Sequence, residues 1–359
     1  MISKFNNELD KYFQKLSKKS GPDQPLQVLV SSKKLGINFE YSNITNDQPF
    51  HIASVGKIFT ATIIGMLCDK GDIGLSDKII IYLDEKVLDR LFIYEGEDYK
   101  SQITIKDLLG HTSGIADYFE SSVTAGSKFV DKILAEPDVM WTPQSILDFT
   151  RNNQKAGSEP GKFKYSDTGY ILLGLLIENV TAKSFSDNLK SLIFDPLGMN
   201  DSYLMFFSEP NNIPKKDIAK IWFNNVEISK LNLLSCDWAG GGIVSTTNDL
   251  LKFQQAFRDG KLVSTNFLQK MDDFVNKYRA GIFYGLGMME LRFQGFFFLL
   301  LGMPRPKGHI GILSTHLFYD FENDTHIIMN FGSNSRMVES FKALIFIEQK
   351  VKRYKKRIK

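Results

Sequence analysis

Ser54 and Lys57, three positions apart at the start of an apolar stretch, are residues whose types and spacing could do chemistry together. Residues i and i+3 share one face of a helix, so both side chains would point into the same space. A lysine in an apolar wall can lose its proton near neutral pH and deprotonate a hydroxyl. The N–H groups of a first helical turn favour an oxyanion there. The pair predicts a nucleophile and its base; a capping serine beside a solvated lysine is the alternative.

A tyrosine and a carboxylate two positions apart, Tyr165 and Asp167, lie on a loop that leads into an apolar helix expected over residues 171–180. Pro160-Gly161 punctuates this loop, and Thr168 is expected to cap the helix. Both side chains could project into a cleft. A core tyrosine with a capping aspartate is the alternative.

Three glycines, Gly240 to Gly242, precede a short strand and a helix that Thr246 and Asp249 are expected to cap. The Lys-Ser/Thr continuation of a phosphate-binding loop does not follow them. The glycines therefore indicate close packing of backbones.

Hydrophobic periodicity predicts the helices and strands that must position these residues. Nearly every face of the segment from Val55 to Cys68 is apolar, which predicts a central, buried helix. Amphipathic helices are expected over 5–18 and from Arg336 onward, a short helix over 103–110, and strands over 26–30, 37–41, 284–293, 296–301, 310–319 and 325–330. Strands at both ends with helices between them imply a sheet built from both termini and a helical insertion.

The composition, 43% hydrophobic and 24% charged over 359 residues, is that of an ordinary globular protein, and no run reaches the length of a membrane span. Cys68 and Cys236 are expected to be reduced core residues, and no Cys/His spacing indicates zinc. The first residues contain no apolar signal-peptide core, so a cytoplasmic location is expected, or an extracytoplasmic one if a leader has been removed.

The net charge of +3 comes from the end of the chain, which holds seven of the 44 basic residues: Lys350, Lys352, Arg353, Lys355, Lys356, Arg357 and Lys359. Such a tail could touch an anionic membrane, although a solvated helix end is the favoured interpretation. The body has no basic stripe interleaved with aromatics, which argues against a nucleic-acid partner.

Three short motifs resemble, in order and approximate spacing, the signatures of penicillin-recognising serine hydrolases. They are Ser54-Val55-Gly56-Lys57, Tyr165-Ser166-Asp167 and His309-Ile310-Gly311. Further phrases resemble the class C β-lactamase and esterase branch: residues 108–114, 170–174, 196–199 and 241–246. The match spans roughly residues 25 to 345. The resemblance implies an α/β (α+β) fold of the β-lactamase/transpeptidase type, with an antiparallel sheet flanked by helices. We expect residues 1–80 and 235–359 to form the sheet domain and 81–234 an inserted, mostly helical domain.

The resemblance also implies roles. Ser54 would attack a carbonyl, Lys57 would take or share its proton, and Tyr165 would relay a proton to the leaving group and activate water. The oxyanion hole would be the backbone N–H groups of Ser54 and Ile312, and substrate contacts would come from Asp167, His309 and Gly311. Neither a metal nor an organic cofactor is implied.

Two positions depart from the β-lactamase pattern. His309 stands where Lys-Thr-Gly has lysine, and a histidine is mostly neutral at pH 7, so it would bind a penicillin carboxylate less well. Asp167 replaces the usual asparagine beside Lys57. We therefore expect a serine hydrolase that cleaves a small ester, amide or short peptide through an acyl-enzyme. The alternatives are β-lactamase or D-amino-acid/DD-peptidase activity, and a catalytically idle binding protein with the same fold.

Overall fold

An eight-stranded antiparallel sheet lies at the centre of the computed structural model, which describes residues 1–21 and 23–358. The strand order is β10-β11-β12-β13-β14-β15-β1-β2. The strands are β1 (Gln27–Ser32), β2 (Ile37–Ser42), β10 (Asn276–Arg279), β11 (Ile282–Tyr284), β12 (Met289–Leu291), β13 (Lys307–Gly311), β14 (Thr315–Asp320) and β15 (Thr325–Asn330). Gln27 of β1 stands opposite Asn330 of β15, so the N-terminal hairpin joins a sheet whose other strands come from the end of the chain, as predicted.

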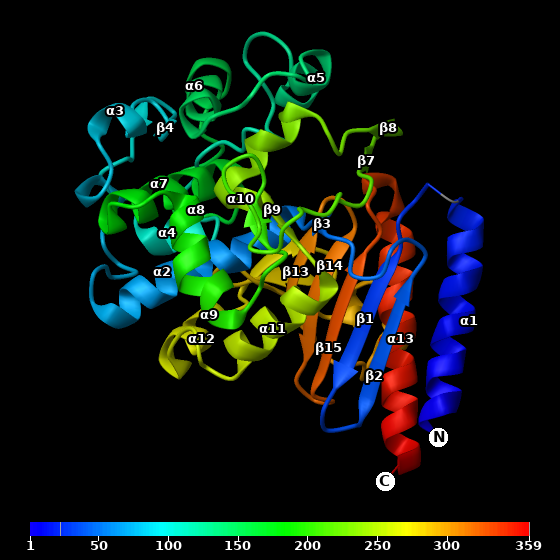
Figure 1. Cartoon of the computed structure of the whole chain (residues 1–359). Coiled ribbons are helices and arrows are strands. Elements are labelled where there is room, and N and C mark those ends of the chain that lie inside the picture. The colour runs from blue at the N-terminus through cyan, green and yellow to red at the C-terminus, as the bar shows by residue number, and fades with distance from the viewer. Residues whose placement is uncertain (22, 359) are drawn as a thin grey trace.

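Two terminal helices, α1 (Ile2–Ser20) and α13 (Met337–Ile358), cover one face of this sheet (Figure 1). Side chains alternate between the faces of a strand. Val28 and Val30 accordingly pack with these two helices, whereas Leu29 between them joins the core on the opposite face. The expected amphipathic helices at both termini are confirmed.

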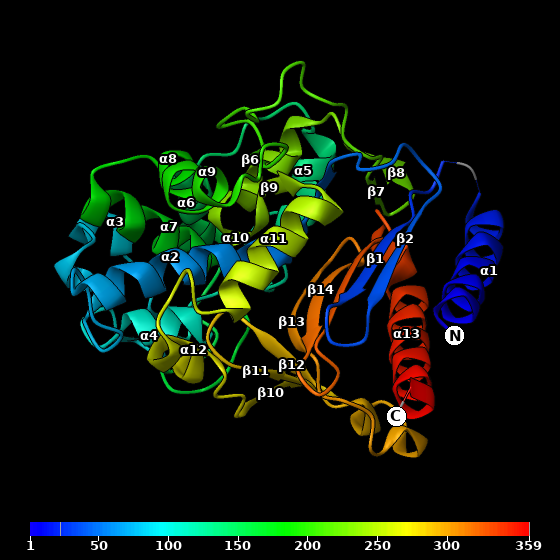
Figure 2. The ribbon, with the colours of Figure 1, turned by 60° about the horizontal axis from the view of Figure 1, so that its bottom comes forward.

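The opposite face carries the long middle part of the chain, which is mostly helical (Figure 2). Its helices are α2 (Gly56–Lys70), α3 (Glu85–Leu88), α4 (Ile105–Leu109), α5 (Phe129–Ala135), α6 (Pro143–Asn153), α7 (Asp167–Thr181), α8 (Phe185–Leu189), α9 (Asp195–Leu197), α10 (Trp238–Gly241), α11 (Thr247–Arg258) and α12 (Thr265–Met271). Helix α2 is buried along most of its length, as its all-round apolar pattern predicted. The expected fold class, an antiparallel sheet flanked by helices, is confirmed.

Short strands outside the main sheet complete the fold. β3 (Phe50–His51), β9 (Ile243–Ser245) and β6 (Tyr203–Leu204) form a three-stranded sheet, and β4 (Ile93–Tyr94) with β5 (Glu97–Asp98) and β7 (Trp222–Phe223) with β8 (Val226–Glu227) form two hairpins. Strand β3 matters for the site, because the chain passes from it directly into the turn that carries Ser54.

The apolar run Phe296 to Leu301 is not the buried strand expected from its composition. It forms part of a loop with two single 3₁₀ turns, Phe293–Gly295 and Phe298–Leu300, between β12 and β13. These strands pair directly with each other, so no place in the sheet remains for an intervening strand. The strands expected over 284–293 and 310–319 are also interrupted, because each contains a turn.

The prediction that Thr168 caps α7 is wrong. Ser166 precedes the helix, and Thr168 lies inside its first turn, where its hydroxyl accepts a hydrogen bond from the Tyr118 N–H at 2.9 Å. The cap expected for the helix after the three glycines is confirmed, because Thr246 caps α11 by accepting from the Asp249 N–H at 3.1 Å. Thr104 caps α4 in the same way.

Candidate active site

The turn that carries Ser54 is held by backbone packing rather than by a side-chain cap. Ala53 to Val55 form a single 3₁₀ turn that continues into α2, and Ala53 has a positive φ of 48°. Such a conformation costs free energy in a residue other than glycine and persists only where surrounding structure imposes it. A Cβ at Gly241 would lie 2.7 Å from the Ala53 carbonyl carbon, so only glycine fits beside this turn. The close packing predicted for the glycine-rich segment is confirmed.

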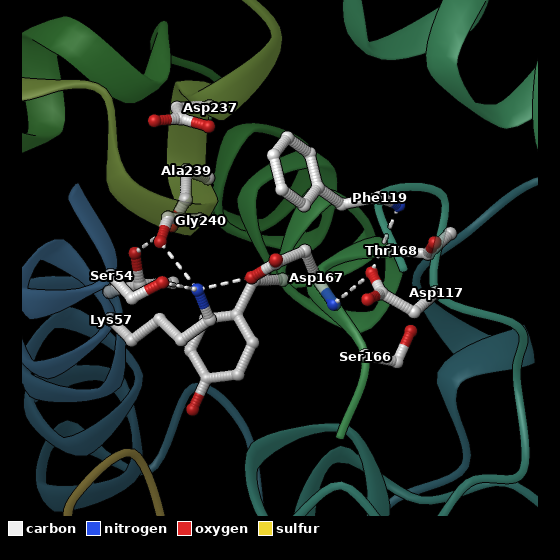
Figure 3. A network of polar contacts seen from close by, with 12 residues as sticks. Ser54, Lys57, Asp117, Phe119, Ser166, Asp167, Thr168, Asp237, Ala239 and Gly240 are labelled. Carbon is white, nitrogen blue, oxygen red and sulfur yellow. Dashed lines mark hydrogen bonds and ion pairs between the residues drawn. The ribbon is translucent and has the colours of Figure 1, made fainter. Parts of the chain in front are cut away.

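Lys57 is buried and points at Ser54. Its Nζ donates to Ser54 Oγ at 3.0 Å and to the Gly240 carbonyl at 2.7 Å, and it forms an ion pair with Asp167 (Figure 3). An ammonium group has three N–H donors and no acceptor, so these three partners match its full donor set. The arrangement fits a resting state in which Lys57 carries a proton and Asp167 is its counter-ion.

Tyr165 lies on the other side of the same amine. The Lys57 Nζ is 5.3 Å from the centre of the Tyr165 ring, and Tyr165 lines the same cleft as Ser54. Burial, reinforced by the charge of Asp167, raises the pKa of Tyr165 well above its ordinary value. Tyr165 is therefore a neutral phenol at pH 7, which can donate its proton but is not a resident phenolate base.

A second carboxyl group, that of Asp117, stands behind Asp167. It accepts hydrogen bonds from the backbone N–H groups of Asp167 at 3.0 Å, Phe119 at 3.3 Å and Glu120 at 3.0 Å. Burial and the charge of Asp167 nevertheless raise the pKa of Asp117 to about 8. Asp117 is therefore mostly protonated at pH 7, which leaves Asp167 as the carboxyl group that pairs with Lys57. No sequence motif marks Asp117, so sequence reasoning missed it.

These residues open into a cleft with about 850 Å³ of empty space, its mouth included. The cleft is lined by Ala53, Ser54, Phe119, Glu120, Tyr165, Asp167, Asp237, Gly240, Tyr278, Arg279, Ile282, Met289, Ile310, Gly311, Ile312, Met337 and Phe341. The apolar part comes mainly from the sheet and α13, and three carboxyl groups face it. Gly311 and Ile312 border the cleft at the end of β13, on the same cavity as Ser54.

Asp237 lines the cleft and, like Asp117, is marked by no sequence motif. Its carboxyl lies 3.7 Å from the Nε2 of buried His51. Burial lowers the pKa of His51 to about 4, so this ring is neutral and the contact is not a charged pair. Burial and the charge of Asp167 raise the pKa of Asp237 to about 7. Its position three residues before the glycines that pack on Ser54 was the signal that could have identified it.

His309 lies beneath the cleft rather than in its lining. Its Nδ1–H donates to the Ile310 carbonyl at 2.8 Å, and the Tyr284 hydroxyl donates to its Nε2 at 3.1 Å. Burial, with the charge of Lys57, lowers the pKa of His309 to about 3. A neutral, buried imidazole offers no charge to a substrate carboxylate, and a role of His309 in substrate binding stays a prediction.

The two cysteines are free thiols, as expected. Across residues 1–21 and 23–358, no group of three or more His, Cys, Asp or Glu side chains is arranged to hold a metal ion. Ser54, Lys57, Tyr165 and Asp167 thus come together from two separate segments, with Gly311 and Ile312 of a third segment on the same cleft.

Known proteins similar to this chain are found by sequence and by structure. Penicillin-binding protein 4* of Bacillus subtilis is 34% identical over 173 residues, which are 46% of this chain and 34% of that protein. Teichoic acid D-alanine hydrolase of Staphylococcus aureus is 26% identical over 267 residues, 70% of this chain and 58% of that protein. The chain thus matches between about a third and somewhat more than half of the length of these curated relatives.

The D-amino acid amidase from Ochrobactrum anthropi SV3, solved with L-phenylalanine amide, superposes with a TM-score of 0.79 at 25% identity. The superposition covers 98% of this chain and 99% of that one. The family model described as "Beta-lactamase" matches residues 35–351, which is most of the sequence. The chain belongs to the Beta-lactamase family.

Proposed function

We propose that this protein is a serine hydrolase that cleaves a small ester or amide through an acyl-enzyme, with Ser54 as nucleophile, Lys57 as its base and Tyr165 as proton relay. The observation that carries the proposal is the contact of the Lys57 amine with Ser54 Oγ at 3.0 Å inside a cleft that also contains Tyr165. A nucleophile and a base within hydrogen-bond reach, with the base oriented by a third group, are the usual requirement for this chemistry. Here Asp167 is the third group.

The ion pair dictates the order of proton movements in the proposed mechanism. An ammonium cannot accept a proton, so Lys57 acts as base by passing one proton to Asp167 while it takes another from Ser54. Ser54 Oγ then bonds to the substrate carbonyl carbon. The leaving group departs with a proton from Tyr165, which the Lys57–Asp167 pair replaces. In deacylation, water attacks the acyl carbon and gives a proton to Tyr165 while the phenol passes its own proton to Ser54 Oγ. The bond between Ser54 Oγ and the acyl carbon then breaks, which releases the acid and restores the free enzyme.

The oxyanion of each tetrahedral intermediate would lie against the backbone N–H groups of Ser54 and Ile312. Both residues border the cleft. A single donor of this kind is typically worth about 2.7–4 kcal/mol of the activation barrier. This assignment of the oxyanion hole is part of the proposal.

Simple esters are better candidate substrates than penicillins. The cleft offers three carboxyl groups, those of Glu120, Asp167 and Asp237, and its one lining cation, Arg279, lies 4.0 Å from Glu120. A penicillin carries a carboxylate, which this lining would repel rather than bind. We therefore expect kcat/KM for short-chain activated esters to exceed that for β-lactams.

A second candidate is an amide or peptide with a free amino group, such as a D-amino acid amide. The observation in its favour is the Asp237 carboxyl, which faces the cleft and has a pKa of about 7, so that a nearby ammonium would favour its ionised form. The names of the amidase and of the D-alanine hydrolase point to the same class of substrate.

The decisive experiment for the hydrolase is covalent labelling. Incubation with a fluorophosphonate probe, followed by mass spectrometry of the digest, should place the adduct on Ser54, and Ser54→Ala should lose both the label and turnover. Ser113→Ala, which changes another serine on a nearby turn, is the matched control and should keep the label. An unlabelled Ser54 in a folded sample would instead support the idle binding protein.

The substrate candidates separate in a paired screen. Each D-amino acid amide is assayed beside its N-acetylated form, and simple esters and β-lactams complete the panel. If the amine is recognised, Asp237→Asn raises KM for the free amine and leaves the N-acetyl form and the esters unchanged. An equal change for all three would remove Asp237 from substrate recognition.

A further inference from the structure

The loop between β12 and β13 exposes a group of large apolar side chains. Phe297, Phe298, Leu299 and Leu301 are 52%, 73%, 67% and 77% exposed. Single exposed apolar residues are ordinary, but a contiguous group marks an interaction site. We call these four side chains the apolar tip. Figure 2 shows the loop that carries it, in yellow-orange, beside the C-terminal end of α13.

The loop is fixed to the protein by its inner side. Phe296 packs edge-on against Phe341 of α13 with 5.2 Å between ring centres, and Leu300 packs against the core under this face of the sheet. Lys352 donates to the Gly302 carbonyl. The outward position of the apolar tip is therefore built into the fold.

Positive charge lies next to the apolar tip. Residues 350–357 of α13 contain six basic side chains and no acidic one: Lys350, Lys352, Arg353, Lys355, Lys356 and Arg357. The contact of Lys352 with Gly302 joins this basic end of the helix directly to the loop. Arg353, Lys356 and Arg357 are exposed and form no ion pair among the described residues. Lys350 is engaged with Glu8 of α1.

We propose that the apolar tip and the basic end of α13 together dock this protein on the surface of an anionic lipid bilayer. Aromatic and leucine side chains insert at the boundary between headgroups and acyl chains, while lysine and arginine bind anionic headgroups. No helix within residues 1–21 and 23–358 is long and apolar enough to cross a membrane. The charge beside the tip favours an anionic bilayer over a second copy of this chain, because two identical basic surfaces repel each other.

Docking would also set the position of the cleft relative to the membrane surface. Phe341, against which Phe296 packs, lines the cleft together with Met337 at the start of the same helix. The docking surface and the cleft are thus attached to one rigid element, α13. The docking proposal does not depend on the hydrolase activity.

The test is sedimentation of the full chain with vesicles of phosphatidylcholine alone or with 30% phosphatidylglycerol. Binding should be strong on anionic vesicles, weak on neutral ones, and reduced by 0.5 M salt. Phe297→Ser/Phe298→Ser/Leu299→Ser should weaken binding by about a hundredfold, because it removes the inserted groups. Arg353→Gln/Lys356→Gln/Arg357→Gln should weaken binding to anionic vesicles by about fivefold per charge and leave neutral vesicles unaffected.

Control variants carry changes of the same kind elsewhere on the surface. Ile80→Ser/Ile81→Ser removes two other exposed apolar side chains, and Lys128→Gln/Lys155→Gln/Lys183→Gln removes three exposed charges from the helical region. Both should bind as the wild type does. Equal binding by the tip variant and the wild type, or no binding by the wild type, overturns the proposal. So does light scattering that shows a wild-type dimer which the tip variant converts to a monomer, because a second copy would then cover the tip.

Discussion

Two acidic groups on opposite sides of the sheet, one half-buried and one fully buried, show how differently this fold treats a carboxyl. In the cleft, Asp167 keeps 17% of its side chain exposed and is paired with Lys57. On the far side, Glu348 of α13 is fully buried, and neither of its carboxyl oxygens accepts a hydrogen bond from the described residues. Burial and the charge of Asp320 raise the pKa of Glu348 well above its ordinary value.

The carboxyl groups of Asp167 and Glu348 differ in their charge state. Glu348 is kept as a neutral acid, because an unpaired charge in an apolar core is too costly. Asp167 has a cation beside it and can stay ionised, and its charge in turn raises the pKa values of Asp117 and Asp237. Of these two carboxyl groups, Asp167 is the one that holds a charge beside the proposed nucleophile. The predictions below test this contrast.

The largest loss of activity and stability is expected from removing the Lys57 amine, the cation that pairs with Asp167. Lys57→Ala should lower kcat by a factor of about 10³ or more, because the proposed base is lost. It should also lower the free energy of unfolding by about 3 kcal/mol, because Asp167 is left without its counter-ion. Activity assays and urea unfolding measure the two effects.

The control is the double variant Lys57→Ala/Asp167→Ala, which removes both charges. It should recover much of the lost stability and none of the activity. A double variant that is less stable than Lys57→Ala would mean that the ion pair is not the reason for the loss.

Particular residues show how much of the site could be predicted from the sequence. Ser54 and Lys57 were predictable because their contact follows from the local geometry of one turn and the helix after it. Asp167 was predicted as a site residue, and a contact with Lys57 was considered from its position beside Tyr165. That contact depends on the fold and could not be established from spacing along the chain. Asp117 and Asp237 escaped detection, since their meaning depends on long-range packing and not on spacing along the chain.

The apolar run at Phe296 to Leu301 was misread for a related reason. Hydrophobicity alone does not tell whether a short apolar segment is a buried strand or an exposed surface. That choice was decided by β12 and β13, which pair with each other and leave the run outside the sheet. The site of the proposed membrane contact was therefore hidden in a segment expected to be core.

The next effect concerns the charge of Asp167. In Asp167→Asn the ion pair with Lys57 is lost, so the rise of kcat/KM with pH should move to lower pH. A neutral ester is the right substrate, because it excludes effects on substrate charge. Superimposable pH profiles for the variant and the wild type would show that the ion pair does not control the base.

Glu348→Gln should give a smaller effect, on stability alone. The pKa of Glu348 is raised in the folded state, so above its ordinary value of 4.5 the unfolded chain releases a proton that the folded one keeps. The wild type therefore loses stability as pH rises, with a slope of up to about 1.4 kcal/mol per pH unit, and the variant lacks this loss.

The advantage of Glu348→Gln over the wild type should thus grow between pH 5 and pH 8 in urea unfolding. Glu339→Gln makes the same change near the start of α13, where the side chain is paired with Arg336, and serves as the control. A difference that does not vary with pH would mean that Glu348 is ionised in the folded protein.

The smallest effect is expected at His309. Its pKa of about 3 keeps the ring neutral throughout the range in which the protein is assayed, so it contributes no titration near pH 6.5. His309→Gln preserves a neutral side chain that can both donate and accept a hydrogen bond beneath the cleft. The pH profile of kcat/KM on a neutral ester should keep its shape, even if kcat falls slightly through altered packing at Tyr284. Loss of an inflection near pH 6.5 in the variant would show that His309 is protonated during the wild-type reaction.

His309→Lys tests whether charge at this position controls recognition of a substrate carboxylate. If it does, the variant should show a higher ratio of β-lactam to ester turnover than the wild type. An unchanged ratio would remove His309 from substrate binding.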